Sequence, residues 1–124
     1  MRDKETDSKE RIEHILKAIS DIESFIENQT KESFLESYLT INATLFQFAV
    51  IGEAIVHVDN DILNRYSYPW HKVRGFRNFI LHEYQAIEYR IVWDAAKNDL
   101  AELKKVLKKI LENEWQNKIN KLMQ

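Results

Sequence analysis

The sequence contains no cysteine, and this absence excludes several kinds of chemistry. Without thiols the chain has no disulfide, no cysteine nucleophile and no thiolate metal ligand. Glycine and proline are also scarce, with two and one among the 124 residues. A chain of many short strands needs turn residues about every 8–12 positions, so a β-rich fold is excluded as well. The composition therefore predicts an all-α protein with a few long helices.

Segments typical of export or of membrane insertion are missing too. The first residues, MRDKETDSKER, are charged and lack the apolar stretch of a signal peptide. No apolar run approaches the roughly 20 residues that span a bilayer. With 44% hydrophobic and 31% charged residues, the composition is that of a globular protein. We therefore expect a single cytoplasmic domain over residues 1–124.

Hydrophobic periodicity divides the chain into helices and short connections. The expected segments are helices over 8–28, 31–58, 69–82 and 88–115, a short turn or loop at 61–68, a linker at 83–87 and a frayed tail at 116–124. Ser8 and Thr30 are suited to cap the first two helices. Pro69 fits the first turn of the third, where a missing N–H is harmless.

Residues 43–56, ATLFQFAVIGEAIV, are apolar on nearly all sides of the second helix. Such a helix is buried on more than one face, and in a small chain a second copy could cover the additional face. Glu53 lies within this run. A buried carboxylate needs a partner, and a cationic side chain is the natural one.

Charge is unevenly distributed along the chain, although the net charge is only −2. Residues 1–64 carry six Lys/Arg against thirteen Asp/Glu, whereas residues 65–90 carry five against two. The second segment is therefore locally cationic and suited to an anionic ligand. The Lys104–Lys109 cluster is typical of a solvated helix face, with contact to RNA as the alternative.

The cationic segment includes RGFRNFILHEY, residues 74–84. On an ideal helix one polar stripe forms from His71, Arg74, Asn78 and His82, at positions i, i+3, i+7 and i+11. Arg77 falls instead between the apolar Val73 and Ile80. An arginine there needs an acidic partner or an interface, and Glu53 is the candidate partner.

Arg77 and His82 have the chemistry of a ribonuclease site. A neutral imidazole can take the proton from a ribose 2′-hydroxyl. A guanidinium can hold the scissile phosphate, and Asn78 could orient the imidazole. Five positions separate the pair, about 140° around a helix. Either the helix loosens near His82 and the long, flexible side chain of Arg77 reaches it, or a two-fold axis along this helix places His82 of one copy beside Arg77 of another.

A purely structural interpretation of the same residues stays open. Arg77 could simply pair with Glu53, while His82 ends a helix and Tyr84 packs on the core. Trp70 and Trp93 are expected in the core rather than as platforms for bases. His14 and His57 are assigned no chemistry.

The stretch PWHKVRGFRNFILHEY resembles the signature of the HepT-like toxins of the HEPN superfamily. That signature is Pro-Trp, then Gly-hydrophobic-Arg-Asn, then R-x4-H-x-Y. Pro69-Trp70, Gly75-Phe76-Arg77-Asn78 and His82-Glu83-Tyr84 match it without a gap. The resemblance extends over residues 2–112 and departs at Asn98-Asp99, where many members have Leu-Pro.

The resemblance implies a four- to five-helix up-and-down bundle that dimerises through its motif-bearing helices. It implies a metal-independent endoribonuclease without a cofactor, acting as the toxin of a toxin–antitoxin pair. The implied partners are RNA, a second copy and an MntA-like nucleotidyltransferase antitoxin, with a larger hetero-oligomer that includes the antitoxin as the alternative to a simple homodimer. By position, Arg77 and His82 are the catalytic pair, Asn78 and Arg74 assist or bind RNA, and Tyr84 is the site of adenylylation.

Two alternatives accompany this hypothesis. The chain could be a non-catalytic helical subunit that binds a nucleotide or substrate for a separate nucleotidyltransferase. It could also be the antitoxin or an inert scaffold, although the intact Arg77 and His82 argue against this through the resemblance.

Overall fold

The computed structural model describes residues 4–83 and 86–124, and every regular element in these ranges is helical. The elements are α1 (Lys4–Ile26), α2 (Lys31–Glu36), α3 (Tyr38–Val56), α4 (Asn60–Leu63), α5 (Trp70–Glu83), α6 (Tyr89–Asp94), the π-helical η2 (Ala95–Asp99), α7 (Leu100–Leu111), the π-helical η3 (Glu112–Gln116) and α8 (Asn117–Leu122). The predicted all-α class is confirmed.

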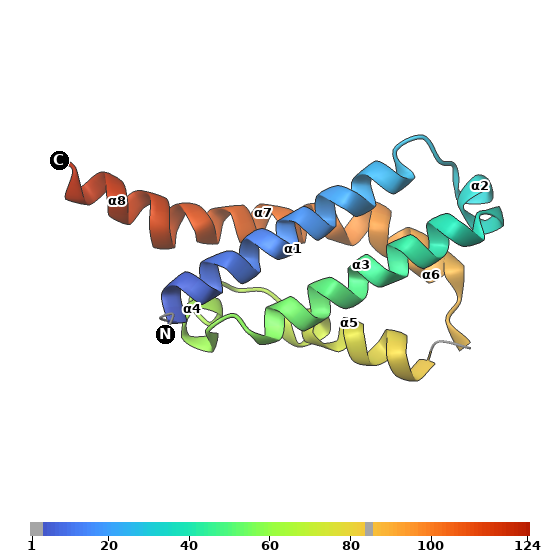
Figure 1. Ribbon diagram of the computed structural model, residues 1–124, viewed down its shortest axis with the longest axis horizontal. Helices are drawn as coiled ribbons and strands as arrows, with labels where there is room; N and C mark the ends of the chain where they lie inside the picture. Colours follow the sequence, from blue (N-terminus) through green and yellow to red (C-terminus); the bar gives the residue numbers. More distant parts are fainter. Residues whose placement is uncertain (1–3, 84–85) are drawn as a thin grey trace.

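Helix α3 is the centre of the bundle. It packs against α1 on one side and against α5 on the other, and α7 packs against α1 (Figure 1). The segment from α6 to α8 forms one long helical rod, whose α8 end extends past the start of α1 (Figure 1). This arrangement leaves α5 at the edge of the bundle, along α3.

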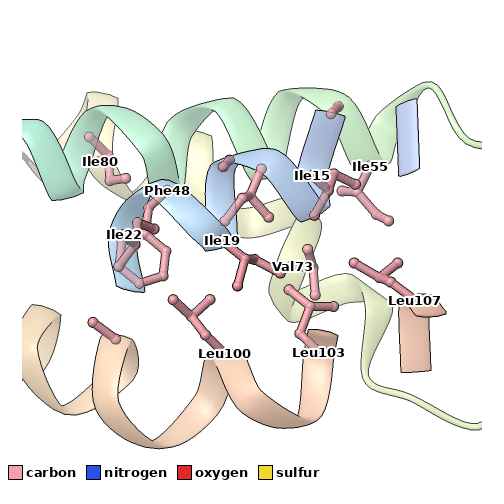
Figure 2. Close-up of a cluster of buried hydrophobic side chains, with 14 of the residues drawn as sticks. Ile15, Ile19, Ile22, Phe48, Ile55, Val73, Ile80, Leu100, Leu103 and Leu107 are labelled. Carbon is pink, nitrogen blue, oxygen red and sulfur yellow. The ribbon is translucent and has the colours of Figure 1, made fainter. Parts of the chain in front are cut away.

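The core joins side chains from four helices (Figure 2). The labelled members are Ile15, Ile19 and Ile22 of α1, Phe48 and Ile55 of α3, Val73 and Ile80 of α5, and Leu100, Leu103 and Leu107 of α7. Each of these side chains is at most 9% exposed. Burial of these side chains is the main force that holds α5 on the bundle, since apolar burial dominates folding free energy.

The first helix begins earlier than predicted, and Ser8 is not its cap. Ser8 lies inside α1, is 1% exposed, and its hydroxyl accepts a hydrogen bond of 2.9 Å from the backbone N–H of Asp59. It thereby ties α1 to the turn between α3 and α4. Thr30 is confirmed as the cap of the next helix, in a reciprocal capping box with Ser33.

The predicted single helix over 31–58 is wrong, because the chain breaks at Ser37 into α2 and α3. Ser37 has an extended backbone, with φ −100° and ψ 90°. Its hydroxyl accepts a 3.3 Å hydrogen bond from the N–H of Thr40 and so caps α3. Serine competes in this way with continuous helical hydrogen bonding.

The last predicted helix, 88–115, continues further and contains two π-helical segments. Asn98-Asp99, where the sequence departs from the resembled pattern, lies in η2. A π segment accommodates an inserted residue by widening one turn. The side chains after it therefore point in a different direction around the helix axis. The tail that was expected to fray from residue 116 forms α8 as far as Leu122.

Helix α3 corrects one expectation about membranes. By length and composition its 19 residues could cross a bilayer, although no such run was expected from the sequence. The faces of α3 that contact α1 and α5 are buried in the protein. Packing at the centre of the bundle therefore accounts for the apolar residues on these two faces, whereas Leu39 and Phe46 of the same helix are exposed.

Candidate active site

Helix α5 carries the RGFRNFILHEY motif, and its first turn is anchored by Trp70. The indole N–H of Trp70 donates to the backbone carbonyls of Leu63 and Tyr66, at 3.0 and 3.2 Å. The ring itself is 6% exposed. Arg74, one turn later, donates from Nη2 to the side-chain oxygen of Asn60 at 2.7 Å. These contacts hold the start of α5 against α4.

The middle of α5 lies unusually close to α3, at Gly52. A methyl group at position 52 would lie 2.6 Å from the backbone nitrogen of Arg77. Beside this crossing, the rings of Phe48 and Phe76 meet edge to face with centroids 5.4 Å apart. The absence of a side chain at Gly52 therefore brings the backbone of Arg77 directly onto α3.

The guanidinium of Arg77 contacts Glu53, with Nε 3.1 Å from Oε2. The other carboxylate oxygen, Oε1, lies 3.4 Å from Nε2 of His57. Glu53 was expected to be buried, which is wrong: the side chains of Glu53 and Arg77 are 52% and 49% exposed. Glu53 lies on the outward face of α3, where solvent reaches the carboxylate. Arg77 is thus available to a ligand from outside.

His82 and Asn78 are exposed on the same helix. Helix α5 continues to Glu83, so the alternative in which the helix loosens near His82 is wrong. On a regular helix the five-residue offset directs Arg77 and His82 about 140° apart. Within one chain the two side chains therefore lie on different flanks of α5. Tyr84, the predicted modification site, lies outside the described residues.

The structure includes His57 in this group, although the sequence interpretation assigned it no chemistry. The signal was available, because residues four apart on a helix are neighbours, and His57 follows Glu53 by four. The reason it was missed is that this spacing occurs often by chance.

Among residues 4–83 and 86–124, no three His, Asp or Glu side chains come close enough to hold a metal ion. The chemistry that the motif can perform with its own side chains is proton transfer by an imidazole and charge stabilisation by guanidinium groups.

Two tyrosines have a raised pKa, Tyr66 and Tyr68, and both belong to the scaffold rather than to the motif. Burial raises the pKa of Tyr66, whose hydroxyl donates to Glu114 Oε2 at 2.9 Å. Burial also raises the pKa of Tyr68, and the carboxylates of Glu102 and Asp99 add to the shift. Arg65 pairs with the same Glu114. These contacts fasten the segment before α5 to the α7–η3 rod.

Comparison with known proteins places the motif in a wider group. The family described as "Ribonuclease HepT-like" matches residues 15–110. A Methanocaldococcus jannaschii protein named "Putative RNase" is 34% identical over 110 residues, covering 85% of this chain and 90% of that protein. A Thermococcus cleftensis protein named "Probable ribonuclease HepT" is 30% identical over 103 residues, covering 82% of this chain and 94% of that protein.

A second Methanocaldococcus jannaschii protein is longer. It is named "Gamma-glutamylcyclotransferase and putative RNase" and is 29% identical over 116 residues. The alignment covers 93% of this chain but only 52% of that protein, so the chain spans about half of its length. No solved structure matches the chain significantly.

Proposed function

Since the chain belongs to the HepT-like ribonuclease family, we propose that it is a metal-independent endoribonuclease that cleaves RNA in the cytoplasm. We propose further that it acts as the toxin of a toxin–antitoxin pair. The observation that carries the proposal is the placement of Arg77 and His82 on two accessible flanks of one regular helix.

The proposed site is composite, with Arg77 from one copy and His82 from another. The two side chains point about 140° apart within one chain, whereas a two-fold interface pairs residue i of one copy with residue j of the other and could set Arg77 beside the second copy's His82. Apolar surface is present on the Arg77 flank, where Leu81, one turn later, is 57% exposed. On the outward face of α3, Phe46 is 64% exposed and precedes Glu53 by two turns. Burial of such side chains favours association.

The proposed reaction is an internal transfer at the RNA phosphate. His82 takes the proton from a ribose 2′-hydroxyl, and the 2′-oxygen attacks the adjacent phosphorus. The bond from phosphorus to the 5′-oxygen breaks, leaving a 2′,3′-cyclic phosphate, and the departing 5′-oxygen takes a proton from the His82 imidazolium or from water to become a 5′-hydroxyl. Arg77 stabilises the additional negative charge on the phosphoryl oxygens during the attack. Asn78 and Arg74, on the outer side of the same helix, would contact the RNA backbone.

A mixing experiment tests the composite site directly. Arg77→Ala and His82→Ala are each expected to abolish cleavage of a fluorescent RNA in EDTA. Unfolding the two variants together in urea and refolding them at equal amounts would form mixed dimers. About a quarter of wild-type activity should return, because half of randomly assorted dimers are mixed and each has one intact site of two.

Three results would contradict the proposal. Cleavage by either single variant at the wild-type rate would refute the catalytic role proposed for the residue that it lacks. If the refolded mixture of the two variants forms dimers by light scattering but does not cleave RNA, the idea of a site shared between two copies would be refuted. A wild-type protein that binds RNA without cleaving it would instead favour a non-catalytic binding subunit.

The proposed regulation is adenylylation of Tyr84 by a nucleotidyltransferase antitoxin. The attached AMP would carry bulk and negative charge two residues beyond His82, and it would repel and block the RNA phosphate. Intact mass after co-expression with a candidate antitoxin should increase by one or more AMP units, and Tyr84→Phe should remove the increase. An unchanged mass with a functional antitoxin would contradict this regulation.

A further inference from the structure

A groove of about 350 Å³ runs between α5 and the α6–η2 segment, on the flank of α5 away from Glu53. Its floor is made by buried apolar side chains, among them Phe48 and Val92. Its rim includes Phe79 and Ile91, which are 46% and 53% exposed. Such a volume and apolar lining are typical of a site for a small ligand or for one group of a larger ligand.

Gly75 forms part of the groove wall and has no packing role inside the chain. A methyl group at this position would meet nothing within 4 Å, in contrast with Gly52, whose methyl would clash with α5. Glycine in the middle of a helix is less favourable than alanine, so the bare backbone at Gly75 costs stability without an internal contact in return. A close approach by a group from outside the chain would use that space.

The groove lies beside the proposed catalytic histidine. Gly75, Phe79 and His82 follow one another at positions i, i+4 and i+7, which share one face of α5. A ligand that contacts His82 therefore continues naturally into the groove. Lys72 and Asp99 also line it and provide one cation and one carboxylate.

We propose that this groove binds a nucleobase of the RNA, from a nucleotide next to the scissile bond. The base stacks on the ring of Phe79 and lies against the backbone at Gly75. Asp99 accepts a hydrogen bond from an amino or imino group of the base, and Lys72 contacts a neighbouring phosphate. The position next to the scissile bond rests on the function proposed above, whereas base binding itself does not.

The dimensions of the groove favour a base over a protein segment. A stable protein interface buries about 800 Å² on each partner, so a groove of about 350 Å³ could form only a small part of one. The apolar lining of the groove suits the flat faces of a base, and the charged side chains of Lys72 and Asp99 suit its polar edge. A second copy seated in the groove is therefore the alternative that the experiment must separate.

The test uses RNA hexamers that cannot be cleaved, with 2′-O-methyl riboses and a single fluorescent base analogue, 2-aminopurine or pyrrolocytosine. Stacking in the groove quenches the fluorescence of the analogue. Phe79→Ala should weaken binding by roughly 5- to 150-fold, the usual effect of losing one base–aromatic stack. Gly75→Leu should fill the groove and prevent quenching. Ser20→Leu, which adds the same side chain at an exposed position of α1, should bind as the wild type does.

The outcomes separate this proposal from the ribonuclease proposal. The base site would be overturned if both Phe79→Ala and Gly75→Leu quench the fluorescence of the analogue as strongly as the wild type does. It would also be overturned if the wild type does not quench this fluorescence. A smaller oligomer of Gly75→Leu with unchanged RNA binding would assign the groove to a second copy and also overturn it. A wild type that quenches but never cleaves a natural RNA would sustain the base site and refute the ribonuclease. If Gly75→Leu fails to fold, Phe79→Ala decides, because its side chain is half exposed.

Discussion

The two glycines of the chain provide a matched pair of perturbations with opposite expected signs. Both lie inside helices, but Gly52 faces the backbone of α5 and Gly75 faces open space. In Gly52→Ala the added methyl would lie 2.6 Å from the Arg77 nitrogen and 3.1 Å from Cβ of Phe76. Carbon atoms normally approach to about 3.5–4.0 Å, so α3 and α5 must separate.

The size of the effect follows from two opposing contributions. Overpacking of a core typically costs about 1–3 kcal/mol. Replacing glycine by alanine within a helix regains about 0.5–1 kcal/mol. Gly52→Ala should therefore destabilise the protein by roughly 0–2.5 kcal/mol. Gly75→Ala has only the favourable contribution and should stabilise it by about 0.5–1 kcal/mol.

Urea unfolding followed by circular dichroism measures both variants, at one protein concentration because association also contributes to stability. The midpoint should fall for Gly52→Ala and rise for Gly75→Ala, with similar slopes. Midpoints that move in the same direction would refute the inferred close approach of α3 and α5. Under conditions where both are folded, Gly52→Ala should also cleave RNA more slowly, because the displaced backbone belongs to Arg77.

Three further predictions concern the scaffold and the ion pair. Trp70→Phe removes an indole N–H that donates to two backbone carbonyls, and it should cost about 1–3 kcal/mol in urea unfolding. Burial raises the pKa of Tyr66 and Tyr68 above 10 in the folded protein. As the pH rises, the unfolded chain therefore loses the protons of these two hydroxyls before the folded protein does. Stability should be independent of them below pH 10 and fall as the pH rises further, and Tyr66→Phe with Tyr68→Phe should flatten that fall. Glu53→Gln should change the free energy of unfolding by less than about 1 kcal/mol, since the pair with Arg77 is half exposed. A larger loss would show that this ion pair is structural.

Much of the motif-bearing helix was predictable from sequence. Pro69 and the apolar spacing of Val73 and Ile80 locate α5 within a residue at either end. The pairing of Arg77 with Glu53 also follows from two opposite charges in apolar surroundings, and the structure contains this contact. Local patterns suffice in these cases because they depend on neighbours along one helix or on a strong charge preference.

Features that depend on tertiary contacts were not predictable. An all-round apolar helix does not specify which face stays open, so the exposure of Glu53 could not be deduced. The break at Ser37 competes with an uninterrupted apolar pattern, and the pattern is the stronger signal. The two π segments, η2 and η3, rotate the side chains that follow them around the helix axis, and the composition of the sequence does not signal this. The contrast between Gly52 and Gly75 exists only after α5 is packed on α3.

The carboxylate beside Arg77 has a consequence for how the protein behaves among the abundant anions of a cell. Before any RNA arrives, the guanidinium already has a negatively charged neighbour in Glu53. Inorganic phosphate or a free nucleotide would have to compete with that neighbour and would gain little from the exchange. A polynucleotide brings many additional contacts at once, and these favour its entry. Because this half-exposed ion pair is worth less than about 1 kcal/mol, Glu53 would weaken the binding of a single small anion by at most about fivefold, a handicap that a polynucleotide offsets with its other contacts.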